Sequence, residues 1–208
     1  MKKSYIVIGS ILLFLLIILL SYRSIYNNAV SLQETVDETW NNVQVTYQRR
    51  ADLIPQLVDV VMGATKNEKE IVTEVTRARA GLPSQEEVDM LKAEIKNADS
   101  PEKLSLLEAK LKSNDRAAQA FLNVAVEAYP NLKSIEGFNS LQSQLEGTEN
   151  RISKARSDYN ESIKKYNSHI RGFFARMVVN SEEFPRKTGF EADKGAENKT
   201  EDTRRLIE

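Results

Sequence analysis

A long amphipathic stripe with a cation at its centre constrains the fold of this sequence more than any other feature. Over residues 36–61 apolar side chains recur at alternating intervals of three and four, which is the spacing of one buried helix face. The stripe consists of Val36, Trp40, Val43, Tyr47, Ile54, Leu57 and Val61. Arg50 takes the place of the missing member. Because an unpaired buried charge is strongly unfavourable, Arg50 must find a partner or an opening to water.

Pro55 lies inside the same stripe. It cannot donate a hydrogen bond to the carbonyl of Ala51, and it biases Ile54 away from helical backbone angles. We therefore expect the helix to kink or restart at Pro55. If the chain bends back there or near Gly63, the number of long helices beyond the apolar segment rises from three to four.

A run of uncharged, mostly apolar residues precedes the stripe. Residues 5–20 are built almost wholly of Ile, Leu, Val and Phe, and Tyr5 and Tyr22 flank the run. With its flanks the run approaches the ~20 residues needed to cross a bilayer, and tyrosine favours the interface. Residues 21–25 offer no small-x-small cleavage site, so an uncleaved anchor is favoured over a signal peptide. Residues 1–26 are predicted to be a membrane anchor.

The charges around this run predict its orientation. Lys2 and Lys3 precede it, whereas only Arg23 follows closely before Glu34 and Asp37. Positive charges favour the cytoplasmic side. We therefore expect a single-pass protein of the cell membrane with a cytoplasmic N-terminus and the remainder of the chain outside the cytoplasm.

Turn signals divide the rest of the chain. Gly and Pro within residues 81–83 mark a stop, and Ser84 with Glu87 fits a capping box that starts the next helix. Residues 97–101 interrupt the helical pattern, which resumes and then ends at residues 129–130. Each interval between these signals carries its own apolar stripe, so each predicts an amphipathic helix.

The last helix is predicted from a seven-residue repeat of large side chains. Its members are Phe138, Leu145, Ile152, Tyr159, Tyr166 and Phe173. Amphipathic segments joined by short turns pair antiparallel, so residues 27–183 predict an elongated antiparallel bundle of three to four long helices. The fold class is all-α. Residues 184–208 are predicted to be a disordered tail, because residues 191–208 carry mixed charge and no aromatic side chain.

Composition argues against several classes of function. The formal net charge is -1, and Lys and Arg alternate with Glu and Asp, so no basic patch indicates a nucleic-acid partner. The sequence has no Cys and one His, His169, which disfavours a metal site. No phosphate-binding loop or nucleophile motif is present. We expect a protein that is not an enzyme and holds no cofactor.

Two blocks of sequence resemble the LemA family, a bacterial family whose members carry W-x-x-V-x-x-Q-x-x-R-R-A-D-L-I-P-N-L-V after an N-terminal membrane helix. Here Trp40 and Val43 precede R-R-A-D-L-I-P at residues 49–55, and Gln56 stands where Asn is usual. The second block includes E-A-Y-P-N-L at 127–132, T-E-N-R-I at 148–152 and Y-N at 159–160. The resemblance implies a membrane-anchored helical bundle. It implies no settled activity, and it leaves the opposite membrane orientation open.

The two blocks contain ten candidates for a structural or partner-binding role. They are Arg49, Arg50, Asp52, Pro55, Glu127, Tyr129, Pro130, Glu149, Tyr159 and Asn160. For Arg50 and Asp52 we favour a polar network that fixes the register of the bundle. The alternative is a docking site for a carboxylate-bearing ligand or a partner helix at Pro55. Glu127 and Glu149 are the leading partners for Arg50, since both lie in the second block.

The repeated Tyr-Asn pairs, at residues 159–160 and 166–167, have a simple structural interpretation. One seven-residue repeat places both tyrosines on the packing stripe and both asparagines beside it.

Two hypotheses of function follow. The first is a membrane-anchored, non-enzymatic scaffold or adaptor that forms homo-oligomers or binds a membrane-protein partner, because strips of Leu, Ala and Ser exceed the needs of one bundle. The second is a membrane-tethered ligand-sensing bundle, which would act through a partner protein because the chain has no output domain. An enzyme is the third and least favoured class.

Overall fold

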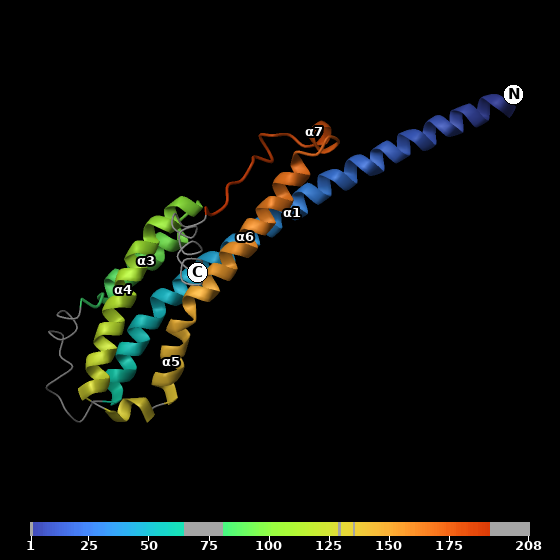
Figure 1. Cartoon of the computed structure of the whole chain (residues 1–208). Helices are drawn as coiled ribbons and strands as arrows, with labels where there is room; N and C mark the ends of the chain where they lie inside the picture. The colour runs from blue at the N-terminus through green and yellow to red at the C-terminus, as the bar shows by residue number, and fades with distance from the viewer. Residues whose placement is uncertain (1, 65–80, 129, 135, 192–208) are drawn as a thin grey trace, which may run out of the picture.

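The computed structural model describes residues 2–64, 81–128, 130–134 and 136–191, and every regular element within these ranges is helical (Figure 1). The elements are α1 (Lys2–Ala64), α3 (Gln85–Lys96), α4 (Pro101–Ala128), the 3-10 helix η1 (Pro130–Ser134), α5 (Glu136–Glu146), α6 (Thr148–Ile170) and α7 (Ala175–Val178). The predicted all-α fold class is confirmed. The capping box is also confirmed, because the Ser84 side chain accepts from the Glu87 N–H while the Glu87 carboxylate accepts from the Ser84 N–H.

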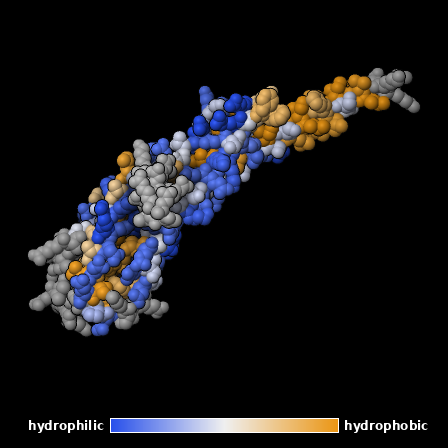
Figure 2. All heavy atoms as spheres, in the orientation of Figure 1, coloured by the Kyte–Doolittle hydropathy of each residue, from blue (hydrophilic) through white to orange (hydrophobic). Residues whose placement is uncertain are grey.

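Helix α1 is the axis of the molecule. Its 63 residues span about 95 Å at 1.5 Å per residue. The large apolar side chains from Tyr5 to Leu20 are all exposed, and this part of α1 is long and apolar enough to cross a membrane. The other helices pack on the remainder of α1 (Figure 1). Figure 2 shows the apolar surface of the N-terminal part giving way to a mostly hydrophilic surface along the bundle.

Pro55 does not end α1, so the predicted restart is wrong. The helix continues through Pro55 to Ala64. The neighbouring side chains Leu53, Ile54, Leu57 and Val58 are all at most 2 % exposed. Tertiary packing of this face offsets the hydrogen bond that proline cannot make, since packing rather than intrinsic propensity supplies most helix stability in proteins. The predicted continuation of the stripe beyond Gly63 lies outside the described residues.

Helix α6 runs back along α1. Near the apolar part of α1 the Asn28 amide lies 3.3 Å from the His169 ring nitrogen, and further along the helix Arg50 reaches Glu149. Helices α3, α4, α5 and α7 also contact α1, so each α-helix of the bundle touches the same central helix, whereas η1 contacts α4 and α5.

The core consists of two hydrophobic clusters that meet at Arg50. The first cluster lies toward the apolar part of α1 and includes Ala29, Val36, Val43, Ala51, Leu104, Leu111, Ile152 and Tyr166. The second lies toward the end of α1 and includes Leu53, Ile54, Leu57, Phe121, Leu132, Phe138 and Leu145. Ala51 is the last residue of α1 in the first cluster and Leu53 the first in the second, so the buried cation stands at their boundary.

The predicted last helix is divided in the structure. It is interrupted at Gly147, where the buried Thr148 hydroxyl donates to the carbonyl of Leu145 at 2.6 Å. It ends at Ile170, and Phe173 is 76 % exposed instead of continuing the buried series. A local side-chain hydrogen bond competes with the helical pattern at the first point, and the seven-residue repeat of apolar side chains carries no signal for it.

Residues 184–191 are packed against the bundle, so the predicted boundary of a disordered tail at residue 184 is wrong for them. The Asn160 side chain donates to the Phe190 carbonyl at 3.0 Å and accepts from its N–H at 2.8 Å. Asn167 binds both backbone groups of Lys187 in the same way, at 2.8 and 3.2 Å. Asn160 and Asn167 are seven residues apart on a helix, and Lys187 and Phe190 are three residues apart in an extended segment. Both separations are about 10 Å, so the spacing of the two asparagines matches that of the backbone groups they bind. The rest of the predicted tail, residues 192–208, lies outside the described residues.

Substitution of Gly189 tests this attachment. A Cβ at Gly189 would lie 2.5 Å from Oδ1 of Asn160. Gly189→Ala should therefore displace the segment and lower the amide-exchange protection of Phe190 by at least about fivefold, since each hydrogen bond contributes about 1 kcal/mol. Gly137→Ala is the matched control, because a Cβ there meets no atom within 4 Å. Equal protection in the two variants would contradict the attachment.

Candidate functional site

Arg50 joins three helices in the middle of the bundle. Its side chain is 2 % exposed. Nε donates to Oδ2 of Asp115 in α4 at 2.7 Å, and Nη2 donates to the same oxygen and to Oε1 of Glu149 in α6 at 2.7 Å. The prediction of Glu149 as a partner is confirmed. Glu127 is exposed near the end of α4 and is not a partner, whereas Asp115 was not predicted.

Arg50, Asp115 and Glu149 form the first arginine layer, and its two carboxylates keep Arg50 charged. Burial opposes the cation, but hydrogen bonds and charge from Asp115 and Glu149 outweigh burial and raise the pKa of Arg50. Burial raises the pKa of Asp115, against the opposing effect of Arg50. Arg50 Nη1 and Asp115 Oδ1 are buried without a hydrogen-bond partner among the described residues. Glu149 is 54 % exposed, so one end of the layer reaches water.

A second arginine, Arg156, is partly buried on α6, two helical turns after Glu149. Arg156 donates to the Glu108 carboxylate of α4 and to the Tyr47 hydroxyl of α1. Its guanidinium carbon lies 4.8 Å from the centre of the Phe190 ring. Burial raises the pKa of Tyr47 to about 12. This second layer therefore ties the same three helices together as the first.

The two arginine layers follow one seven-residue repeat. Glu108 and Asp115 are seven residues apart on α4, as are Glu149 and Arg156 on α6. Leu104 and Leu111 share that face of α4 and are fully buried. The sequence carried a usable signal for Glu108 and Asp115, because both stand four residues after a stripe leucine, where a core-facing side chain is expected.

The comparison with protein families agrees with this geometry. The model of the LemA family matches residues 39–203. The chain belongs to the LemA family. The matched range contains both arginine layers, the Arg49–Pro55 block and all described helices beyond the first part of α1. A comparison with curated proteins gave no match.

Arg49 and Asp52, two further candidates of the first block in this LemA protein, contact helices other than those joined by the arginine layers. Arg49 points away from the core and donates to the Gln144 side chain of α5 at 3.0 Å. Asp52 lies 2.6 Å from the Lys92 ammonium of α3, and both side chains are more than 30 % exposed. Asp52 is therefore not part of the Arg50 network, although both contacts tie α1 to a neighbouring helix.

The candidates of the second block separate into two groups. Tyr159 is buried with its ring centre 5.0 Å from that of Trp40, and Asn160 holds the backbone of Phe190. The packing role predicted for Tyr159 is confirmed, whereas the role of Asn160 was missed. Pro130 is exposed at the start of η1, far from the layers in the chain, and Tyr129 lies outside the described residues.

The two arginine layers consist of ion pairs that join neighbouring helices. Arg50 and Arg156 are each hydrogen-bonded to a carboxylate on a facing helix. Within the described parts of the chain, no group of three or more His, Asp or Glu side chains is arranged to hold a metal ion. In some proteins buried ion pairs fix which helices pair and in which register, and we infer this role for the two arginines.

The burial of Arg50 predicts a difference between the two adjacent arginines. Arg50→Ala leaves Asp115 uncompensated in the core and should cost about 3–5 kcal/mol, or about 10 °C in melting temperature. Arg49→Ala removes an exposed hydrogen bond and should cost under ~1 kcal/mol. Thermal unfolding followed by circular dichroism measures both. Equal and small effects would contradict the assignment.

Glu108 predicts a pH dependence. Burial opposes its charge, but hydrogen bonds from Lys112 and Arg156 outweigh burial and lower its pKa below the usual 4.5. A lowered carboxyl pKa gives stability that is present above about pH 4.5 and is lost as the pH falls through the lowered value. Glu108→Gln should therefore destabilise at pH 7, and its difference from the parent should shrink on acidification. Glu38→Gln, at an exposed site of α1, is the control, and a pH-independent difference for Glu108→Gln would contradict the account.

Proposed function

We propose that this LemA protein is a membrane-anchored, non-enzymatic helical scaffold or adaptor. Its elongated antiparallel bundle assembles with other copies or binds a membrane-protein partner. The observation that carries the proposal is the continuity of α1. One uninterrupted helix contains both the exposed apolar segment and the part on which the other α-helices of the bundle pack.

Continuity has a mechanical consequence. A flexible tether would leave a bundle free to tumble above the membrane, whereas a continuous helix transmits the orientation of the anchor to the bundle. Ile25 and Tyr26, a few residues beyond the apolar run, already pack against the first hydrophobic cluster. The bundle is thereby held at a defined angle and height, which suits a protein that positions partners and is not required for a catalyst.

The pairing of the charged side chains inside the bundle supports a scaffold over an enzyme. Arg50 and Arg156 are bound to carboxylates of neighbouring helices, and the side chains of Asn160 and Asn167 are bound to the chain's own backbone. These polar groups stabilise the bundle, and none is presented to a substrate. Catalytic groups, by contrast, are usually held in a cleft with their reactive atoms accessible.

An outward face of α4 supports assembly. Leu106 is 76 % exposed and Val124 is 55 % exposed. They are eighteen residues apart, which is five helical turns, so they lie on one line along the helix. Ser113 and Ala120 lie on the same face and are small enough to allow close approach of a neighbouring helix. We propose this face as a contact between copies.

The proposed location of the bundle is outside the cytoplasm. Lys2 and Lys3 before the apolar run, against Arg23 alone close behind it, support a cytoplasmic N-terminus.

A membrane-tethered ligand-sensing bundle is the second candidate. It is favoured by an open pocket of about 590 Å³ between α3 and α4, lined by both polar and apolar side chains that include Glu87, Met90 and Asn114. A ligand there should raise the melting temperature of the parent and fail to raise that of Met90→Trp, which fills the pocket.

The scaffold proposal is tested with single cysteines, because the chain has none of its own. Leu106→Cys and Val124→Cys should form disulfide-linked dimers or adducts of discrete mass when membranes are oxidised, whereas Gln119→Cys, on another exposed side of α4, should not. An impermeant maleimide added to intact cells should label the same cysteines if the bundle lies outside. Equal crosslinking at all three positions, or none, would contradict assembly through this face. Labelling only after lysis would reverse the orientation.

A further inference from the structure

Residues 171–178, which we call the tip of the bundle, lie beside the end of the apolar segment of α1. Helix α6 runs toward this end, and the Nε2 atom of His169, one residue before the end of α6, lies 3.1 Å from the carbonyl of Ile25. The Phe184 ring packs edge-on against Tyr26 at 5.6 Å. Residues 171–178, which form the turn and α7 between these two contacts, are therefore held at the level of α1 just past the apolar run (Figure 1).

The height of this tip matches the headgroup layer of a bilayer. Ile25 is five residues beyond Leu20, the last residue of the apolar run, which is about 7.5 Å along the helix. The headgroup layer on each side of the hydrocarbon core is about 5–8 Å thick. If residues 5–20 cross the membrane, the tip lies among lipid headgroups.

The tip exposes large apolar side chains. Phe173 is 76 % exposed, Phe174 is 68 % exposed and Met177 is 75 % exposed. The two phenylalanine rings contact each other edge to face with centres 5.3 Å apart. Clustered exposed aromatics are unfavourable in water and mark an interaction surface. Their position next to the membrane segment indicates that the surface they meet is the bilayer.

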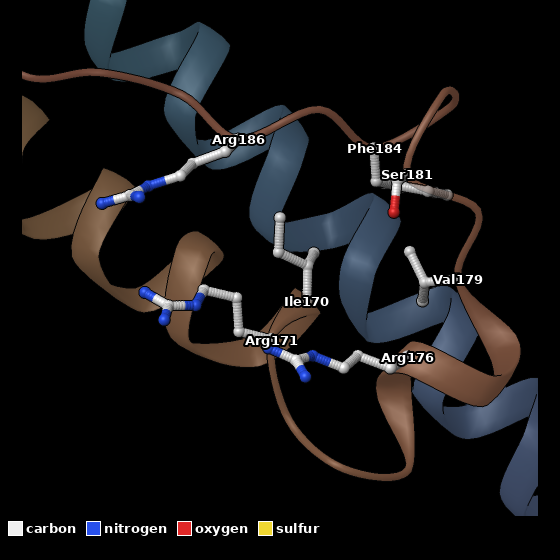
Figure 3. A pocket seen from close by; sticks show the side chains of 7 residues that line it. All are labelled: Ile170, Arg171, Arg176, Val179, Ser181, Phe184 and Arg186. Atoms are coloured by element: carbon white, nitrogen blue, oxygen red, sulfur yellow. The ribbon is translucent and has the colours of Figure 1, made fainter.

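Three arginines line one part of a pocket beside these side chains. Arg171 follows α6, Arg176 lies in α7 and Arg186 lies in the extended segment, and together they line a pocket of about 500 Å³. In Figure 3 their side chains extend in the same direction, while Ile170, Val179 and Phe184 form the apolar side of the pocket.

The three guanidinium groups differ from those of Arg50 and Arg156 inside the bundle. Arg50 and Arg156 are paired with carboxylates, whereas Arg171, Arg176 and Arg186 are exposed and have no ion pair within the described part of the chain. Glu183, a nearby carboxylate, is engaged by the Tyr26 hydroxyl. Guanidinium groups bind phosphate through paired hydrogen bonds, so this cluster has the chemistry of a phosphate site.

We propose that the tip is a binding site for anionic phospholipid, in which Phe173, Phe174 and Met177 insert at the membrane surface and the three arginines hold a lipid phosphate. The inference rests on the proposed membrane anchoring but not on the proposed assembly. It gives the bundle a second attachment to the bilayer beside α1, which fixes the rotation of the bundle about the helix axis.

The test uses full-length protein in lipid nanodiscs of phosphatidylcholine, with or without phosphatidylglycerol, made with lipids brominated near the headgroup end of the acyl chain. A Phe174→Trp variant should be quenched more strongly when phosphatidylglycerol is present. Adding Arg171→Gln, Arg176→Gln and Arg186→Gln should remove about half of that quenching or more. Inorganic phosphate should not compete, because the site is proposed for lipid. Val124→Trp, at the far end of α4, and the parent with Trp40 alone give the background.

Leu16→Trp separates the two proposals. Quenching at residue 16 but only background quenching at residue 174 would overturn the lipid site and leave the anchor intact. Background quenching at both residues would overturn the anchoring and the lipid site with it. Equal quenching at residue 174 with and without phosphatidylglycerol, or full competition by inorganic phosphate, would overturn the assignment of the arginines to an anionic lipid. Matching circular dichroism of all variants confirms that they are folded.

Discussion

The hydrogen bonds between Arg50 and Asp115 are the interaction on which the arrangement of the bundle depends. An arginine that is 2 % exposed is tolerated only where carboxylates face it, so α4 and α6 can pack on α1 in few other registers. A shift of α4 by one turn would bring Leu111, Lys112, Ala118 or Gln119, none of which is a carboxylate, to Arg50 and would move Asp115 away from its cation. The cost of that mismatch, several kcal/mol, is comparable with the whole stability of a typical domain.

The second layer repeats the constraint with the charges placed on different helices. Arg156 is on α6 and Glu108 is on α4, so α4 carries acids in both layers while the cation comes from α1 in one and from α6 in the other. The apolar clusters on either side of Arg50 supply the favourable burial energy, but similar leucine and alanine stripes would also pack in shifted registers. The layers therefore contribute specificity, and the clusters contribute most of the stability. The proposed scaffold, whose outer faces would have to be held in a fixed arrangement, would need both.

How far the sequence predicts this structure depends on how local each determinant is. The burial of Arg50 follows from its place in the stripe, and the start of α3 follows from Ser84 and Glu87, because periodicity and capping are local properties. The core-facing position of Asp115 has a local signal, but its pairing with Arg50 depends on how α1 and α4 are placed, and the two residues are sixty-five apart in the chain. The continuity of α1 through Pro55 could not be predicted either, since local preference opposes it and only the packing of Leu53, Ile54 and Leu57 maintains it.

The C-terminal segment shows the limit of composition as a guide. The sequence groups residues 184–191 with the charged residues after them, yet Phe190 packs near Trp40 and Arg156. Asn160 binds the backbone of Phe190, and Asn167 binds the backbone of Lys187. The sequence predicts that Asn160 and Asn167 lie beside a packing stripe. That position is correct, but the sequence does not predict that their side chains bind the backbone of residues 187 and 190. Side chains that replace a missing strand partner leave no periodic signal, because what they bind is a backbone far along the chain.

A double-mutant cycle on Arg50 and Asp115 tests the central claim most directly. Arg50→Met, Asp115→Leu and the double variant would be compared with the parent by chemical unfolding. If the two side chains form a buried ion pair, Arg50→Met leaves Asp115 without its cation and costs about 3 kcal/mol, whereas Asp115→Leu leaves Arg50 with Glu149 as its remaining carboxylate and costs less. The double variant should recover most of the loss seen in Arg50→Met and give a coupling energy above about 2 kcal/mol. Additive losses with a coupling energy near zero would show that the two side chains do not depend on each other and that the register of the bundle is fixed elsewhere.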